Sequence, residues 1–263
     1  MAYKWDAVDY ARSSTVQQVW ARELIAKLDL QGNEHLLDLG CGDGKVTAEL
    51  ASLLPDGHVI GVDNSPEMIE LAKSSFPASD FPNLKFEVVD VLDLNFNNEF
   101  DVVFSNAVLH WVSDHISVLS GISNALKPGG RILLQMGGRG NAEKVHFAMD
   151  KVCSMPEWRD YFVGLKFPYS FYGLEEYDEW LLNADLIPVR VELIPKDAAH
   201  VDRSAFEGWL RTTWLPYLQR VEKERQDEFI KQVVDCYLTE NPSSSDGVVH
   251  VQMIRLEVEA KKE

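Results

Sequence analysis

The sequence predicts an α/β fold built around a doubly wound, mostly parallel β-sheet. Short apolar runs alternate with helix-forming segments as far as residue 136, an order typical of parallel strands joined by right-handed crossovers. One of these runs ends in a loop with glycine at every second position, Gly40, Gly42 and Gly44. Because a ligand can approach the backbone closely only where no Cβ intervenes, we expect this loop to open a helix and to face a ligand.

The first half of the chain reads as five strands and the helices that join them. Strands are expected near residues 35–40, 58–63, 84–89, 100–105 and 131–136. Helices are expected over 13–28, 44–54 and 114–126, and from Pro66 onward with Ser65 as the N-cap. Before the fifth strand, the stretch Lys127–Gly130 reads as a tight turn.

Beyond residue 138 the alternation loosens and aromatic residues accumulate. The aromatic-rich stretch 153–173 is expected to form a lid or cap rather than sheet. Helices are expected from near residue 141 and over 175–183, 204–213 and 222–238, and strands over 187–193 and 248–258, the last near a sheet edge. We expect a single domain, in which residues 1–138 form a cofactor-binding core with an N-terminal closing helix. Residues 139–263 would then complete the sheet and add a helical substrate cap.

Composition narrows the range of partners. The chain has 263 residues and a formal net charge of −17, which opposes binding to nucleic acid phosphates. No apolar stretch reaches the roughly 18 residues that span a bilayer, and the first residues lack the apolar core of a signal peptide, so we expect a cytoplasmic protein. The three cysteines are widely spaced and are expected to be reduced thiols. Histidines show no ligand spacing with cysteine or carboxylates, so no metal site is expected.

Acidic residues follow the first three predicted strands. Asp38 stands beside the glycine loop, where it could hold a ligand group or fix the loop itself. Asp63 ends the second apolar run, and a carboxylate there can take both hydroxyls of a ribose in a bidentate hydrogen bond. Asp90 and Val91 follow the third strand, where an acid and a backbone amide can read an adenine edge. Asn106 ends the fourth strand, at the point where ligands bind in open α/β sheets.

Taken together, these motifs resemble the class I S-adenosylmethionine-dependent methyltransferases over about residues 5–138. The motifs that carry the resemblance are Leu37–Gly44, Gly61–Ser65, Asp90–Val91, Asn106–Trp111 and Leu126–Gly130, in the order found in that family. The loop reads Gly-x-Gly-x-Gly rather than the nicotinamide fingerprint GxGxxG, which favours S-adenosylmethionine over NAD. The resemblance implies a Rossmann-like sheet of seven strands with an antiparallel last strand. It also implies a cofactor site formed by Tyr10, Asp38, Gly40, Cys41, Gly42, Asp63, Asn64, Met68, Asp90, Val91 and Asn106.

Within this class the chain looks most like the trans-aconitate methyltransferase branch, whose members act on small carboxylates. The resemblance implies O-methylation of an organic acid by in-line displacement. A carboxylate is already ionised at neutral pH and needs no general base. His110 is a candidate base or hydrogen-bond partner, Trp111 a candidate apolar wall, and Arg139, between glycines, our first candidate to bind the substrate carboxylate. Arg203, Arg211 and His200 are weaker candidates.

Two alternatives remain open at this stage. The acceptor could be an amine, a phenol or a ring carbon of another small metabolite, in which case a base such as His110 would matter more. The chain could also be a non-catalytic module that binds the cofactor. In each case we expect a small molecule rather than nucleic acid or a membrane as partner, and a monomer or weak homodimer.

Overall fold

A computed structural model describes residues 15–263, with side chains from residue 20 onward. The chain divides into two compact units, which are described separately. The sheet unit comprises Gln17–Arg139, Tyr169–Ile194 and Arg255–Glu263, and the helical unit includes Gly140–Pro168 and Pro195–Ile254. The sequence expectation of a single domain with a division at residue 138 stays a prediction.

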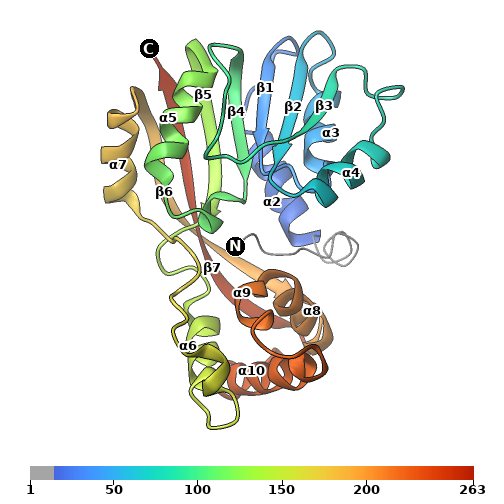
Figure 1. The fold of residues 1–263 in the computed structure, drawn as a ribbon, viewed down its shortest axis with the longest axis vertical. Coiled ribbons are helices and arrows are strands. Elements are labelled where there is room, and N and C mark those ends of the chain that lie inside the picture. The colour runs from blue at the N-terminus through green and yellow to red at the C-terminus, as the bar shows by residue number, and fades with distance from the viewer. Residues whose placement is uncertain (1–14) are drawn as a thin grey trace. The chain divides into compact units, whose positions relative to one another are not determined.

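A seven-stranded sheet with strand order β3-β2-β1-β4-β5-β7-β6 organises the chain (Figure 1). The strands are β1 (His35–Leu39), β2 (His58–Asp63), β3 (Leu84–Val88), β4 (Phe100–Asn106), β5 (Leu126–Gly137), β6 (Leu186–His200) and β7 (Val249–Lys262). Strands β1 to β5 pair in parallel, and β7 runs antiparallel to β5. The expected doubly wound, mostly parallel, Rossmann-like sheet with an antiparallel last strand is therefore confirmed.

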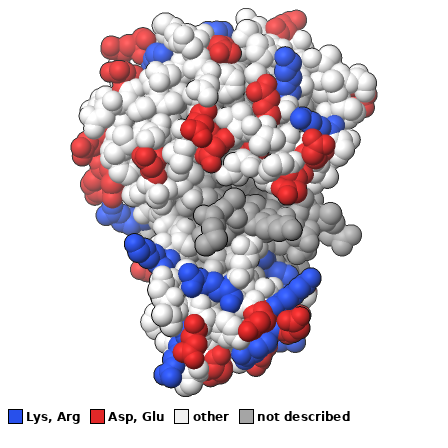
Figure 2. All heavy atoms as spheres, in the orientation of Figure 1, with Lys and Arg blue, Asp and Glu red and all other residues white. Residues whose placement is uncertain are grey.

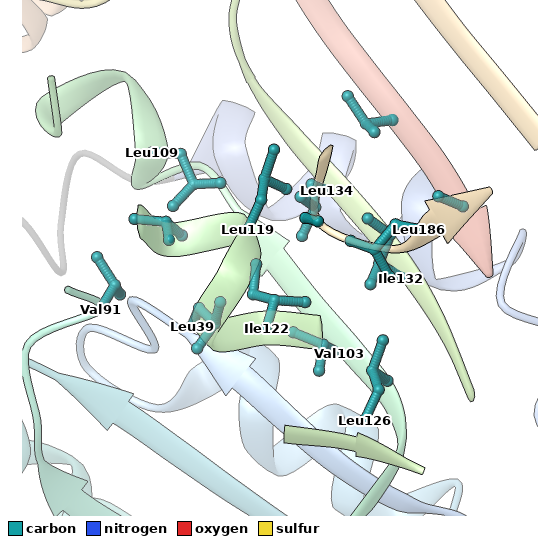
Figure 3. Packing of buried hydrophobic residues seen from close by; sticks show 14 of the residues in the cluster. Leu39, Val91, Val103, Leu109, Leu119, Ile122, Leu126, Ile132, Leu134 and Leu186 are labelled. Carbon is teal, nitrogen blue, oxygen red and sulfur yellow. The ribbon is translucent and has the colours of Figure 1, made fainter. Parts of the chain in front are cut away.

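Helices of the sheet unit belong to two separate hydrophobic cores. The helices are α2 (Thr15–Ile25), α3 (Lys45–Ser52), α4 (Pro66–Ser75), α5 (His115–Ala125) and α7 (Leu174–Asn183). Helices α5 and α7 pack into the core that contains Leu37 and Val103, part of which is shown in Figure 3. Helices α2, α3 and α4 pack into the core that contains Leu36 and Val102. Because successive side chains of a strand point to opposite faces, neighbouring residues of β1 and β4 enter different cores, and the sheet is covered on both faces.

The helical unit is built from α6 (Glu143–Cys153), α8 (Arg203–Thr213), α9 (Leu215–Leu218) and α10 (Gln226–Glu240). The aromatic-rich stretch expected to be a cap contributes Trp158, which is fully buried in this unit. Its indole nitrogen donates a hydrogen bond to Gln232 at 2.7 Å, and its ring lies 5.2 Å from that of Phe229. This part of the aromatic stretch is hydrophobic core, with one short 3₁₀ helix at Arg159–Phe162.

Several element boundaries differ from the sequence expectations. Strand β5 begins at Leu126 and takes in the stretch expected as a tight turn, although Gly129 keeps a φ of 78° and the register with β4 shifts between Phe100 and Val102. Strands β6 and β7 are longer than expected, and β7 lies next to the edge strand β6, near the sheet edge as expected. In the described residues, no helix is both long and apolar enough to cross a membrane.

Candidate functional site

The glycine loop between β1 and α3 is fixed to the neighbouring strand by its own backbone. The amides of Gly40 and Cys41 both donate to the carbonyl of Val62, at 2.8 and 3.0 Å. A Cβ placed on Gly40, whose φ is 72°, would lie 2.4 Å from Val108, whereas one on Gly42 would meet no atom within 4 Å. Gly40 is therefore required by close packing, while Gly42 leaves open space against the backbone, as a ligand cradle needs.

Asp63 holds this loop at the end of β2. One carboxylate oxygen accepts the Gly42 amide at 3.1 Å, and the other accepts the Ser65 amide at 2.9 Å. Burial raises the pKa of Asp63, while the two amide bonds oppose that shift. The next residue, Asn64, is exposed. A ribose diol fits this carboxylate because its hydroxyls can donate to the remaining lone pairs.

Asp38 lies deeper, almost fully buried on β1. Its carboxylate accepts a hydrogen bond of 2.7 Å from the hydroxyl of Thr47 on α3. Burial raises the pKa of Asp38 to about 7; the Thr47 bond opposes the shift and the negative charge of Asp63 adds to it. A buried carboxyl whose cost of ionisation is raised further by a neighbouring acid favours a cationic ligand nearby.

The loops after β2 and β3 supply an apolar and an acidic neighbour. Met68, on the first turn of α4, is buried, and its amide is capped by the Ser65 hydroxyl at 3.2 Å. Asp90 accepts the amide of Leu92 at 3.0 Å, and Val91 is buried in the core next to α5. Because β2 and β3 are adjacent parallel strands, these loops lie at the same sheet edge as Asp63.

Asn106 ends β4 with an unsatisfied acceptor. Its side-chain oxygen is buried and has no hydrogen-bond partner among the described residues. A buried amide oxygen without a partner costs free energy that a bound donor can recover.

Cys41, in the glycine loop, is a buried thiol. Its pKa is raised by burial and by Asp38, so it is not a nucleophile at neutral pH.

His110 lies among aromatic rings after β4, in the 3₁₀ turn Leu109–Trp111. Ring centroids of Trp111, Tyr169 and Phe171 are 5.5, 6.3 and 6.0 Å from the His110 ring. The Gly137 amide donates to Nδ1 of His110 at 3.4 Å. Burial, followed by the positive charge of Arg255, lowers the pKa of His110 to about 3. His110 is therefore a neutral, weakly basic ring in an aromatic surface that also contains Trp111.

His115 belongs to a structural network. Its Nε2 lies 2.8 Å from the carbonyl of Leu109, which can only accept, so this nitrogen carries the proton. Its Nδ1 then accepts from the Tyr177 hydroxyl at 2.7 Å. The network ties the 3₁₀ turn to α7 and so holds the position of His110.

Arg139 interacts with helix α7 rather than with the glycine loop. Its side chain is largely exposed and pairs with Glu176 and, at 3.8 Å, with Glu175, both on α7. Figure 2 shows acidic side chains gathered over the position of α7. In the helical unit, Arg203 pairs with Glu207 at 2.8 Å and Arg211 with Asp227 at 3.2 Å. His200 is buried there beside Phe206 and Trp209, and burial lowers its pKa to about 4.

Sequence reasoning missed Arg255, a buried arginine on β7. Its guanidinium carbon lies 4.9 Å from the centroid of the Trp20 ring on α2. The signal was available, because Val249, Val251 and Met253 set an apolar phase in which residue 255 should be apolar too. A charge at an apolar position of a strand pattern marks a buried polar site.

The structure places the strand-end residues at one edge of the sheet, and one expected site residue falls outside what it describes. Tyr10 precedes the described residues. Among the residues from 15 onward, no group of histidine, cysteine, aspartate and glutamate is arranged to hold a metal ion. The ribose-compatible carboxylate at Asp63, the open backbone at Gly42 and the unpartnered oxygen of Asn106 together fit a nucleoside ligand that carries a donor or cationic group.

Comparison with known proteins places this geometry in context. The family described as "Methyltransferase domain" matches residues 30–165. A trans-aconitate 2-methyltransferase of Methylobacterium nodulans is 30% identical over 262 residues, covering 98% of both chains. A putative methyltransferase from Bacillus halodurans has a similar structure, with a TM-score of 0.64 at 17% identity, over 92% of this chain and 98% of the other. Phospholethanolamine N-methyltransferase 2 of Haemonchus contortus, solved with phosphomonomethylethanolamine and S-adenosylhomocysteine, gives a TM-score of 0.58 at 19% identity, over 93% of this chain and 52% of the other.

Proposed function

We propose, from the premise that this chain belongs to the class I S-adenosylmethionine-dependent methyltransferases, that it methylates a carboxylate oxygen of a small organic acid. The family match and the full-length relative make the chain a methyltransferase enzyme. The acceptor class is the proposal. It is supported by the similarity to a trans-aconitate 2-methyltransferase along both chains, which includes the segments beyond the family match.

The strand-end residues would hold S-adenosylmethionine in the order in which the strands lie. Asp63 would bind the ribose, with exposed Asn64 beside it, and Asp90 with the buried Val91 would hold the adenine. Met68 would pack against the adenosine as an apolar wall. Gly40, Cys41 and Gly42 would line the cofactor with backbone, and Tyr10 would close over the methionine part.

Asp38 and Asn106 suit the methionine end of the cofactor. Asp38 can compensate an ammonium or sulfonium charge directly or through the loop, and the unpartnered oxygen of Asn106 can accept from the ammonium. The cofactor supplies an electrophilic methyl group on a positively charged sulfur. These two side chains would fix the direction in which that methyl group points.

The reaction is a substitution in which atoms and charge balance without a proton transfer. A carbon–oxygen bond forms from the acid's carboxylate as the sulfur–carbon bond breaks, and that electron pair stays on sulfur. The products are a methyl ester and S-adenosylhomocysteine. The protein's main task is to place the oxygen in line and exclude water, and positioning of this kind can supply roughly 7–11 kcal/mol.

The low basicity of His110 favours an acceptor that is already ionised. A ring with a pKa of about 3 is a poor general base at neutral pH, whereas an amine or phenol would gain from a better one. We therefore assign His110 and Trp111 to the acceptor wall rather than to proton transfer. Arg139 is retained only as an outer contact, since Glu175 and Glu176 already pair with it. The acidic charge of the chain argues for a small acceptor over nucleic acid, and we expect a monomer or weak homodimer.

The test follows the transferred label into its product. The purified chain is incubated with methyl-labelled S-adenosylmethionine and a panel of tricarboxylic, dicarboxylic and monocarboxylic acids, amines and phenols. A methyl ester releases labelled methanol in mild base, whereas N-methyl, C-methyl and aryl ether products do not. We expect base-labile label with the acids, trans-aconitate among them. Base-stable label from an amine, phenol or carbon acceptor would overturn the carboxylate assignment and leave the methyltransferase assignment in place.

A further inference from the structure

We propose that the side-chain oxygen of Gln135 binds the ammonium group of the cofactor's methionine part, in partnership with Asn106. The proposal rests on the part of the proposed function that places this ammonium beside Asn106, and it does not depend on which acceptor is methylated. It adds to the cofactor site a residue of β5, a strand from which none of the cofactor residues assigned above comes.

Gln135 has a buried amide whose oxygen is not satisfied by the protein. The residue is 2% exposed, and its side-chain oxygen has no hydrogen-bond partner in the described part of the chain. Asn106 shows the same feature at its own side-chain oxygen. An unpaired acceptor in a protein interior costs free energy that a donor from a bound ligand would recover. Both oxygens therefore lack a donor that a ligand could supply.

The strand register places the two amides side by side. Asn106 is the last residue of β4 and lies opposite Gln135 in the parallel β4–β5 ladder. Register partners in a sheet point to the same face, and neighbouring strands are about 4.8 Å apart. Asp38 shares this face, because it pairs with Phe104, two residues before Asn106. Gln135 is therefore level with the carboxyl end of β4, where ligands bind in open α/β sheets.

Glu257 fixes which way the Gln135 amide points. The two residues are partners in the β5–β7 ladder, and the Gln135 amide nitrogen donates to the Glu257 carboxylate at 3.1 Å. Burial alone would raise the pKa of Glu257, but hydrogen bonds from Lys27 and Arg190 outweigh it and lower the pKa, so this carboxylate is ionised. An ionised carboxylate can only accept, so it must face the amide nitrogen. The oxygen of Gln135 therefore points away from Glu257, whose strand lies across β5 from β4.

An ammonium group matches this pair of acceptors in donor number and spacing. It carries three N–H donors and no acceptor. Two oxygens that each receive a tetrahedral N–H at about 2.8 Å are roughly 4.6 Å apart, close to the spacing of neighbouring strands. Asp38 strengthens the match, because its buried carboxyl favours a positive charge on the same face of the sheet. A single buried water molecule also has two donors, and the experiment separates this alternative.

The experiment combines one change in the protein with one change in the ligand. Gln135→Met removes the amide oxygen but keeps an unbranched side chain of similar length, and Glu257 keeps its pairing with Lys27 and Arg190. The matched control is Gln31→Met, at an exposed glutamine of the same unit. Calorimetry measures the affinity for S-adenosylhomocysteine, for its deamino analogue, which lacks the ammonium, and for its decarboxylated analogue, which keeps it. Thermal unfolding reports whether each variant folds.

We expect Gln135→Met to lower the affinity for S-adenosylhomocysteine about 10-fold, as loss of a hydrogen bond to a charged group does. The decarboxylated analogue should lose affinity by the same factor, because it still carries the ammonium. The deamino analogue should bind Gln135→Met and wild type within about threefold of each other, because it offers Gln135 no donor. Gln31→Met should bind all three ligands as wild type does.

Two results would overturn the proposal. One is an equal loss of affinity for the deamino analogue, which would mean that Gln135→Met disturbs the site in general. The other is wild-type affinity for S-adenosylhomocysteine in Gln135→Met, which would leave the amide oxygen to a buried water molecule. If Gln135→Met does not fold, Gln135→Asn takes its place, because its side chain is one methylene group shorter and withdraws the oxygen. The same two results then decide.

The test of Gln135 is separate from the test of the acceptor. If the acid panel yields no methyl ester, the acceptor class fails, and the three affinities still decide the role of Gln135. If methyl esters form but Gln135→Met loses affinity equally for S-adenosylhomocysteine and the deamino analogue, only the assignment of Gln135 fails. Absence of S-adenosylhomocysteine binding in wild type would overturn the cofactor site and Gln135 together.

Discussion

Thr47 Oγ1 donates a hydrogen bond of 2.7 Å to the buried carboxylate of Asp38, and so joins α3 to β1 beneath the glycine loop. This bond only partly offsets the cost of burying the charge, which raises the pKa of Asp38 to about 7. Because the pKa of this carboxyl is higher in the folded state than in the unfolded chain, the free energy of unfolding falls as pH rises from about 4 to 7. The ionised Asp38 carboxyl therefore lowers the stability of the apo protein above about pH 7.

Asp38→Asn should therefore stabilise the apo protein at pH 8 by about 2 to 4 kcal/mol and change little near pH 3, where the carboxyl is largely protonated in both states. The amide oxygen can still accept from Thr47. Urea unfolding at the two pH values measures the difference, and Asp56→Asn, an exposed acid, is the control. A stabilisation that is the same at both pH values would contradict this account. Cofactor affinity should fall in the same variant, because a compensating charge is lost.

Gly40 and Gly42 should respond differently to the same substitution. In Gly40→Ala the new methyl group would overlap Val108, so we expect a loss of about 2 kcal/mol or more in unfolding free energy. In Gly42→Ala the methyl group meets open space, and only the left-handed backbone costs about 1–2 kcal/mol. Yet Gly42→Ala should weaken S-adenosylhomocysteine binding strongly, because the methyl group occupies the cradle. Unfolding and calorimetry on both variants separate packing from binding, and equal affinity of Gly42→Ala and wild type would contradict the cradle.

Asp63→Asn should lower affinity for S-adenosylhomocysteine by about 10- to 100-fold. The carboxylate accepts the amides of Gly42 and Ser65 on separate oxygens, and an amide side chain can accept only one of them. The variant therefore loses loop order as well as ribose binding. Calorimetric titration measures the loss, and wild-type affinity in Asp63→Asn would remove the basis for the cofactor assignment.

His110 should contribute no titration near pH 6.5 to the reaction. With a pKa of about 3 the ring stays neutral from pH 5 to 8, so His110→Gln should lower kcat for a carboxylate acceptor by less than about tenfold. The pKa of His110 is lower in the folded state than in the unfolded chain. The protein therefore loses stability as pH falls below about 6.5, where the unfolded chain takes up a proton that the folded state does not. His110→Gln should therefore reduce the loss of stability between pH 6.5 and 5. His250→Gln, at an exposed position, is the control. A kcat profile that titrates near pH 6.5 in wild type and not in His110→Gln would restore a base role.

The sequence by itself determined the sheet and the order of its ligand-binding loops. Strand–helix alternation, the acids at 38, 63 and 90 and the glycine loop are local patterns, and each is set by residues adjacent in the chain. The length of β5 could not be predicted from local patterns. Pairing with β4 holds the Lys127–Gly130 stretch in a strand despite its turn composition.

Tertiary structure alone decided which charged groups are buried and which are paired on the surface. Arg139 and Glu176 are 37 residues apart, and α7 must fold beside the end of β5 before they pair. Arg255 becomes a buried cation only when β7 enters the sheet between β5 and β6 and meets Trp20 of α2. Burial and charge pairing depend on contacts between distant segments, so sequence patterns locate the site but do not rank the side chains within it.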